Sequence, residues 1–336
     1  MKAIILKGFG GTENFELREH MGLPEIGPEE VLVKIMATAF NPIDYQMRQG
    51  RSESKRLHSP VLGREFSGTV VRVGTKVRSF HTGDAVFSAS GSMGSNGTYA
   101  EYIVVPAAIL TIKPVHLSYQ QAAAIPVVYL TALQIVDRLG IKSSDRILLT
   151  GAAGGVGLAL IKLLNANADH HIVATAGNVK SKAVLLEAGL ADRQIVDYHQ
   201  PDLKNLILAE NEGEMFDFCI DLVGGEMSEL CASLIRVNGS YADVTALGTS
   251  KALSDFFDKG ATVYHISNYA YALFNHYKWY GDQLGRIAGM LENQEITAPP
   301  LLVFDSFTIQ SVAEAHQILE ENRTNGKKIV MNISTA

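Results

Sequence analysis

The hydrophobic pattern of the chain changes in character near residue 118. Up to about residue 112, short apolar runs such as 30–35 and 68–74 are separated by glycine and polar turns. Short runs at this spacing are typical of an all-β barrel or sandwich. From residue 118 the apolar positions recur at helical spacing, first over 120–125 and then over 129–136. The pattern therefore predicts a β domain followed by a region that contains helices.

From there to about residue 268, strand-like and helix-like segments alternate along the chain. The expected strands are 146–150, 171–175, 194–197, 216–222, 239–244 and 262–266. Strands joined by helices in this way predict a doubly wound parallel sheet, which is an α/β fold. Beyond residue 268 the pattern indicates an aromatic-rich helix near 273–291, a strand near 301–304, a helix near 309–322 and a last strand at 328–333.

The most specific local signal is the glycine-rich turn after the first of these six strands. An apolar strand runs directly into this turn, and a helix follows from residue 156 to about 165. The positions of the dinucleotide template G-x-G-x-x-G read Ala152, Ala153, Gly154, Gly155, Val156 and Gly157, with alanine in the first glycine slot. Glycines let the backbone approach a pyrophosphate, which the helix N-terminus attracts. The alternative is an ordinary strand-to-helix turn.

The end of the second strand bears on the choice of dinucleotide. Proteins that use NAD place an acid about twenty residues past the glycines, where it binds the ribose hydroxyls. Here the segment 174–178 has no acid and ends in Asn178, with Lys180 and Lys182 just downstream. This edge suits the 2′-phosphate of NADPH better than it suits NADH. The alternative is that both lysines are merely solvated.

Composition and charge exclude several classes of partner. The 336 residues are 47% hydrophobic and 19% charged, which is enough apolar material for about two domains. The formal net charge is −6, and the basic residues are scattered apart from the pair Lys55 and Arg56. Neither nucleic acid nor a membrane is therefore expected as a partner.

The cysteine count limits metal and disulfide chemistry. Only two cysteines occur, Cys219 in an expected strand and Cys231 in an expected helix. They cannot build a disulfide framework or a four-cysteine zinc site. With no run that reads as a signal peptide or a spanning helix, we expect a soluble cytoplasmic protein.

Several motifs, taken together and in order, carry a family resemblance that runs nearly end to end. They are 41–44 with 48–50, 63–68, 83–86, 97–102, 221–225, 314–316 and 326–330. On these motifs the chain resembles the zinc-independent quinone oxidoreductase branch of the medium-chain dehydrogenase/reductase superfamily. The resemblance implies a GroES-like β-barrel catalytic domain built from 1–122 and 269–336, and a Rossmann domain at 123–268. It also implies NADPH in the cleft and a homodimer that pairs through the sixth strand of the Rossmann sheet.

The resemblance also implies roles for residues of the β domain. Asn41 and Asp44 would lie near the nicotinamide and the acceptor, with Tyr45 and Arg64 as nearby polar candidates. The alternative for Asp44 and Glu65 is a structural pairing within the β domain. Some enoyl-thioester reductases of the superfamily place a proton-donating tyrosine just beyond the glycine that corresponds to Gly50. Here 51–53 read Arg-Ser-Glu, which argues against a dedicated acid.

In the Rossmann domain, the resemblance implies three further cofactor-binding residues outside the glycine turn. Thr131 would present its hydroxyl to the nicotinamide side, Tyr198 would form a wall of the 2′-phosphate site, and Gly224 would lie close to the cofactor. The alternatives are an intrahelical threonine that bonds a backbone carbonyl and a glycine that simply makes a turn.

The residues themselves indicate whether the chain carries zinc ligands. Zinc-dependent relatives carry a cysteine ligand in a C-x-x-D segment and a histidine in G-H-E, and the matching positions here hold Asn41 and Arg64. Neither serves as a zinc ligand, and the ten histidines show no metal-ligand spacing. The sequence therefore predicts an enzyme without zinc.

Without a Lewis acid, reduction of an activated acceptor is easier than oxidation of an alcohol. A quinone or an α,β-unsaturated carbonyl accepts hydride because the charge delocalises onto oxygen, and water can supply the proton. We therefore predict an NADPH-dependent, metal-free reductase of a small quinone or enone. One alternative is an enoyl-thioester or 2-alkenal reductase. The other is a non-catalytic NADPH-binding protein, either a sensor or a structural protein.

Overall fold

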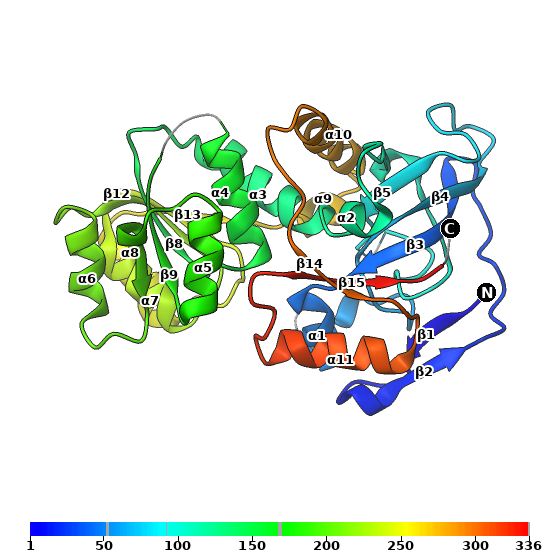
Figure 1. The fold of residues 1–336 in the computed structure, drawn as a ribbon, viewed down its shortest axis with the longest axis horizontal. Coiled ribbons are helices and arrows are strands. Elements are labelled where there is room, and N and C mark those ends of the chain that lie inside the picture. The colour runs from blue at the N-terminus through cyan, green and yellow to red at the C-terminus, as the bar shows by residue number, and fades with distance from the viewer. Residues whose placement is uncertain (52–53, 92, 167–169, 335–336) are drawn as a thin grey trace. The chain divides into compact units, whose positions relative to one another are not determined.

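A computed structural model describes residues 1–51, 54–91, 93–166 and 170–334 of the chain. The chain divides into two compact units (Figure 1). The first unit joins the two chain ends, Met1–Leu130 and Tyr269–Ala336, and the second is the continuous segment Thr131–Asn268.

The first unit is built on a seven-stranded sheet in the order β14-β15-β3-β4-β5-β7, with β6 also paired to β3. The strands are β3 Glu30–Ala39, β4 Glu65–Val73, β5 Ala85–Ala89, β6 Tyr102–Pro106, β7 Thr111–Ile112, β14 Leu301–Phe304 and β15 Lys328–Asn332. A separate pair, β1 Ala3–Leu6 and β2 Phe15–Arg18, is antiparallel. Strand β15 runs antiparallel to β3, with Val330 opposite Ala39, so the end of the chain is part of the same sheet as its beginning.

Helices accompany this sheet in the same unit. They are α1 Pro42–Arg48, α2 Tyr119–Ala123, α9 Tyr269–Leu273, α10 Lys278–Glu292 and α11 Ile309–Glu320, with a short 3₁₀ turn at Ser54–Arg56. Helix α1 contacts α11, and α2 contacts β3 and β4. Asn41 lies at the N-cap of α1 and proline follows it, a favourable helix start because proline has no N–H to leave unpaired.

The second unit contains a six-stranded parallel sheet in the order β10-β9-β8-β11-β12-β13. Its strands are β8 Arg146–Thr150, β9 His171–Ala176, β10 Ile195–Asp197, β11 Phe216–Asp221, β12 Ile235–Asp243 and β13 Thr262–His265. Its helices are α3 Pro126–Leu139, which begins in the first unit, α4 Gly155–Asn165, α5 Val179–Glu187, α6 Leu203–Glu210, α7 Glu226–Leu234 and α8 Ser250–Asp258. This strand order is that of the Rossmann fold, so the α/β prediction is confirmed.

The core of the second unit explains both cysteines. Cys219 on β11 and Cys231 on α7 are fully buried, free thiols that pack with Tyr241 and Phe256. They act as small apolar side chains. Among the described residues, none of the helices combines the length and the apolar character that crossing a bilayer requires.

Candidate active site and dinucleotide-binding edge

The glycine turn after β8 has the geometry of a phosphate-binding turn. Gly151 has φ +68°, in the left-handed region that favours glycine. A Cβ on Gly157 would lie 2.2 Å from the Ala152 carbonyl oxygen, so only glycine lets α4 begin so close to the strand. Because the positive φ falls on Gly151, alanine is tolerated at position 152. The Gly154 N-cap offers no side-chain hydrogen bond to the first turn of α4, whose N–H groups can therefore receive an anion.

Asp221 holds the next loop at the same edge of the sheet. Its carboxylate accepts hydrogen bonds from Thr150 Oγ1 at 2.7 Å, from Tyr241 Oη at 2.8 Å, and from the backbone N–H groups of Val223 and Gly224 at 2.9 and 3.0 Å. Gly224 has φ +79°, and a Cβ there would lie 2.5 Å from Leu247 Cβ. Asp221 is therefore a structural residue, and it positions the Gly224 turn at the carboxyl end of β11.

Two of the residues expected at the ribose lie together at the ends of β9 and β10. Tyr198 follows β10, and its backbone N–H donates to the Ala176 carbonyl at 3.0 Å. Its hydroxyl lies against Gly177, where a Cβ would approach it to 2.2 Å. Asn178 is the N-cap of α5, and its Oδ1 accepts from Ser181 N at 2.9 Å, which leaves the amide nitrogen to face a ligand.

Lys182 has a partner that sequence reasoning missed. Its Nζ lies 2.7 Å from Asp192 Oδ1, and both side chains are substantially exposed. An exposed pair of this kind contributes little to stability, so an incoming phosphate can compete for the lysine.

Thr131 is nearly buried, and it links α3 to the segment that follows β13. Its Oγ1 accepts a hydrogen bond from Asn268 Nδ2 at 2.9 Å. One helical turn later, Gln134 Nε2 donates to the Ser267 carbonyl at 3.4 Å. The Thr131 hydroxyl therefore has a side-chain partner, Asn268, from outside its own helix.

In the first unit, a buried ionic cluster surrounds Asn41. Glu65 is fully buried, and its Oε1 accepts from Asn41 Nδ2 at 2.8 Å and lies 2.7 Å from Lys328 Nζ. Glu65 Oε2 accepts from Val127 N at 2.7 Å, in the first turn of α3. Lys328 also donates to the Phe40 carbonyl at 3.0 Å and to Asn41 Oδ1. Glu65 is therefore part of a structural pairing that orients the Asn41 amide.

Asp44 is buried next to this cluster with only one of its oxygens engaged. Its Oδ2 accepts from the Asn41 backbone N–H at 2.8 Å, whereas Oδ1 has no hydrogen-bond partner among the described residues. Burial raises the pKa of Asp44 to about 7, although the Asn41 N–H and the charges of Arg64 and Lys328 act in the opposite direction. Near neutral pH this carboxyl group is thus close to half protonated.

Two further buried polar groups lie in the same unit. Tyr99 Oη is 3.1 Å from His316 Nε2 on α11. Burial, together with the nearby Asp44 carboxyl group, raises the pKa of Tyr99 well above its ordinary value. Burial and the Arg48 charge lower the pKa of His316 to about 3, so this imidazole is neutral. Both residues belong to motifs noted in the sequence, but nothing there indicated their role.

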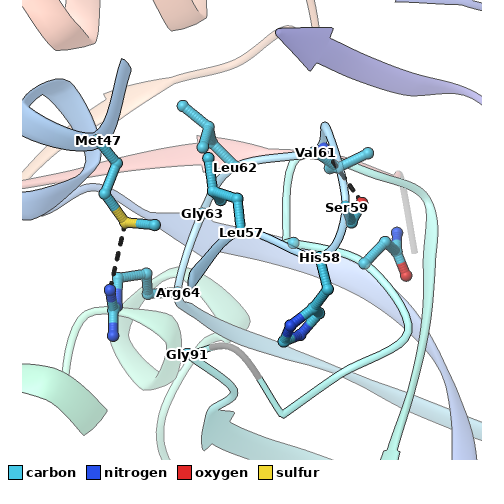
Figure 2. Close-up of a pocket in the computed structure, with 11 residues that line it drawn as sticks. Met47, Leu57, His58, Ser59, Val61, Leu62, Gly63, Arg64 and Gly91 are labelled. Atoms are coloured by element: carbon cyan, nitrogen blue, oxygen red, sulfur yellow. Dashed lines mark hydrogen bonds between the residues drawn. The ribbon is translucent and has the colours of Figure 1, made fainter. Parts of the chain in front are cut away.

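Arg64 borders a small pocket in the first unit (Figure 2). Its Nη1 lies 3.3 Å from Met47 Sδ, and its guanidinium carbon lies 5.5 Å from the centre of the Tyr269 ring. Arg56 lies 4.6 Å from the same ring. The cavity of about 20 Å³ is also lined by His58 and Ser59 and has room for about one water molecule. The sequence did not indicate that two arginines meet on Tyr269.

Tyr45 follows Asp44 on α1 and is half-buried. Asn41, Asp44 and Tyr45 thus share the start of one helix, and the charge of Arg64 acts on Asp44. Of the segment that follows Gly50, Ser52 and Glu53 lie outside the described residues.

At the two positions that hold zinc ligands in zinc-dependent members of the superfamily that the chain resembles, the side chains do not fit zinc. Arg64 carries a guanidinium, which has no lone pair to offer, and the Asn41 amide is engaged by Glu65 and Lys328. Within the part of the chain that the structure describes, no three histidine, cysteine or acidic side chains form a group that could hold a metal ion.

Comparisons with known proteins match both units. Residues 27–115 match the alcohol dehydrogenase GroES-like domain, and residues 191–330 match the zinc-binding dehydrogenase family. The chain is 29% identical to the NAD(P)H oxidoreductase RTN4IP1 of Dictyostelium discoideum, with 99% of each chain covered. It is 28% identical to an NADPH-dependent alkenal/one oxidoreductase of Arabidopsis thaliana, covering 99% of this chain and 80% of that protein. It is 26% identical to human quinone oxidoreductase, with 98% of each covered.

Solved structures agree with these relatives. The quinone oxidoreductase of Coxiella burnetii superimposes with a TM-score of 0.81 at 25% identity and covers 99% of each chain. An alcohol dehydrogenase superfamily protein of Novosphingobium aromaticivorans gives a TM-score of 0.82 at 27% identity, covering 99% of this chain and all of the other. Together with the Rossmann strand order and the glycine turn, these matches show that the chain belongs to the medium-chain dehydrogenase/reductase superfamily. Within that superfamily it is a member of the quinone oxidoreductase-like branch.

The cytoplasmic location expected from the sequence is wrong by these comparisons. Relatives from Dictyostelium discoideum, Bos taurus and Homo sapiens are named as mitochondrial proteins. The expectation rested on the lack of a run that reads as a signal peptide or a spanning helix, together with the small number of cysteines. Buried free thiols are compatible with any compartment that keeps thiols reduced, so they do not identify one.

Proposed function

We propose that the chain is an NADPH-dependent reductase that delivers hydride to a small quinone or enone. The chain is an oxidoreductase of its family and uses a nicotinamide coenzyme, as do two relatives that are named for NAD(P)H and NADPH. The observation that carries the proposal is the turn at Gly157, where the missing Cβ lets the N-terminus of α4 reach a pyrophosphate. The acceptor class rests on relatives that are named for quinones and for alkenals.

The residues of the first unit would then orient the acceptor. Bound coenzyme supplies the hydride. Arg64 offers N–H donors for the acceptor oxygen, on which negative charge develops as hydride arrives. Glu65 and Lys328 hold the Asn41 amide in one orientation. Asp44 and Tyr45 remain candidates at the start of α1, and no zinc takes part, because the donor set described above does not fit a metal.

The experiment that tests this function follows NADPH absorbance with benzoquinone, naphthoquinone, a 2-alkenal and crotonyl-CoA. We expect turnover of a quinone or an alkenal and little with the thioester. Preference for crotonyl-CoA would favour an enoyl-thioester reductase. NADPH binding detected by calorimetry, without consumption of any acceptor, would favour a non-catalytic NADPH-binding protein and refute the proposal.

NADPH rather than NADH is supported by the edge built from Asn178, Tyr198 and Lys182, because the segment 174–178 at the end of β9 holds no acid that could bind the ribose hydroxyls. We predict that Lys182→Glu raises the KM for NADPH about tenfold or more and changes the KM for NADH less than twofold, since a charge-assisted hydrogen bond contributes about 1.5–3 kcal/mol. Steady-state kinetics with both coenzymes measure this. Lys204→Glu, on α6, is the matched control and should affect neither KM. Equal effects of Lys182→Glu on both coenzymes would remove the assignment of NADPH.

The homodimer that the resemblance implies also stays a prediction.

A further inference from the structure

An aspartate and a histidine face each other at the carboxyl ends of β12 and β13. Asp243 and His265 are register partners in the parallel pair, and His265 Nδ1 lies 3.2 Å from Asp243 Oδ2. The Asp243 side chain is 8% exposed and that of His265 is 70% exposed. A buried carboxylate thus contacts one ring nitrogen of an imidazole that is otherwise open to solvent.

The carboxylate is held in place by its other oxygen. Asp243 Oδ1 accepts hydrogen bonds from the backbone N–H groups of Thr245 at 3.2 Å and Ala246 at 2.7 Å. Ala246 has φ +56°, a left-handed conformation that these bonds help to maintain. Oδ1 is therefore used by the loop, and Oδ2 is left to orient the imidazole. An imidazole whose Nδ1 is fixed by a carboxylate presents Nε2 for proton transfer.

The strand order places this pair on the nicotinamide side of the sheet. In a sheet with this strand order, a bound dinucleotide would cross the switch point between β8 and β11, with its adenosine half toward β9 and β10, where Asn178 and Tyr198 lie. Its nicotinamide half would then lie on the side of β11, β12 and β13. The segment after His265 is also tied to Thr131, through the bond from Asn268 Nδ2.

We infer that His265, oriented by Asp243, is the general acid that protonates the reduced acceptor. The inference rests on the proposed function and adds the proton source to it. Hydride adds to the β-carbon of an enone, the C=C electron pair moves toward oxygen, and an enolate results. The proton on His265 Nε2 then passes to the enolate carbon, which gives the saturated ketone. The neutral imidazole regains a proton from water, so the net reaction consumes one NADPH and one proton.

Two charged side chains near His265 act on its imidazolium in opposite directions, and Asp243 is the one that contacts the ring. Asp243 on β12 stabilises the imidazolium, as the carboxylate does in catalytic triads. Arg138 on α3 is the other charged side chain that the structure shows at this segment, among the described residues. Arg138 donates to the His265 backbone carbonyl, and its guanidinium carbon lies 5.6 Å from the centre of the Tyr264 ring.

The test compares His265→Gln with the wild type in steady-state reduction of an enone. The amide keeps a polar group beside Asp243 but cannot titrate. We expect kcat to fall about 100-fold, within the range that general acids contribute, while the KM for NADPH changes less than twofold. The pH profile of kcat in the wild type should contain a limb that is absent in the variant, because the amide does not titrate. Added imidazole should partly restore kcat in His265→Ala.

His171→Gln is the matched control, because His171 lies at the amino end of β9, on the opposite edge of the sheet. It should keep the wild-type kcat and pH profile. Light scattering and circular dichroism on His265→Gln establish that fold and assembly are unchanged. A wild-type kcat and pH limb in His265→Gln would overturn the inference and leave the proposed function intact. Failure of the wild type to reduce any acceptor would overturn both.

Discussion

Replacing Lys328 with methionine should lower the free energy of unfolding by about 3–5 kcal/mol, because it leaves the Glu65 carboxylate buried without its counter-charge. Glu65 is fully buried, and Lys328 Nζ lies 2.7 Å from its Oε1. The remaining bonds to Glu65, from Asn41 and Val127, do not carry a full opposite charge. The single tryptophan, Trp279, lies on α10 of the same unit, so its fluorescence in urea reports on this unit.

Two further variants serve as comparisons for the Lys328→Met measurement. Lys7→Met removes an exposed lysine whose Nζ lies 3.9 Å from Glu16 Oε2, and it should cost less than about 1 kcal/mol. The double variant Glu65→Gln with Lys328→Met removes both charges and should recover much of the lost stability. If Lys328→Met were as mild as Lys7→Met, the buried ionic cluster would not stabilise the unit in the way described.

Replacing Asp44 with asparagine should change how stability depends on pH. From pH 4 to pH 8, the free energy of unfolding of the variant relative to the wild type should rise by about 4 kcal/mol. The pKa of Asp44 is about 7 in the folded chain, whereas an ordinary aspartate has a pKa of 3.8. Each pKa unit of difference corresponds to about 1.4 kcal/mol of stability. Between these values the folded wild type holds a proton that the unfolded chain has released. Its stability therefore falls with rising pH across this window. Asparagine does not titrate, and its amide oxygen can still accept from the Asn41 N–H.

The contribution of His316 to the pH dependence of stability has the opposite sign to that of Asp44. For this reason the quantity to measure is the difference in unfolding free energy between the variant and the wild type. Its pKa of about 3 lies below the ordinary 6.5, so the unfolded chain binds the proton first and the stability falls as pH falls below about 6.5. This contribution is present in both proteins and cancels. Any pH-independent cost of the new amide group also cancels between the two pH values.

Asp84→Asn is the matched control for Asp44→Asn. Asp84 Oδ2 accepts from the backbone N–H three residues earlier, His81, at 2.7 Å, in the same local geometry as Asp44 with Asn41. Its side chain is 30% exposed, so water solvates the charge. Urea unfolding of Asp84→Asn should differ from the wild type by nearly the same amount at both pH values. A flat difference for Asp44→Asn as well would show that the carboxyl group is ionised in the folded chain.

Local patterns predicted the scaffold of the second unit closely. All six expected strands are present, although β12 begins at Ile235 rather than 239, because the exposed residues 236–238 interrupt the buried pattern after Ile235. The turn into α4 was also readable, since the glycine requirement at Gly157 is a contact within a few residues of chain. The expectation that water supplies the proton stays a prediction, beside the proposal that His265 does.

The sequence by itself determined the fold class, because strand and helix periodicity, glycine turns and helix caps depend on neighbours in the chain. The tertiary structure decided which polar groups meet. Lys328 reaches Asn41 across 287 positions, and His316 reaches Tyr99 across 217. Asp243 and His265 meet only because parallel strands end at one edge of the sheet. Burial, which raises the pKa of Asp44, likewise depends on packing from elements distant in the chain, and no local pattern encodes it.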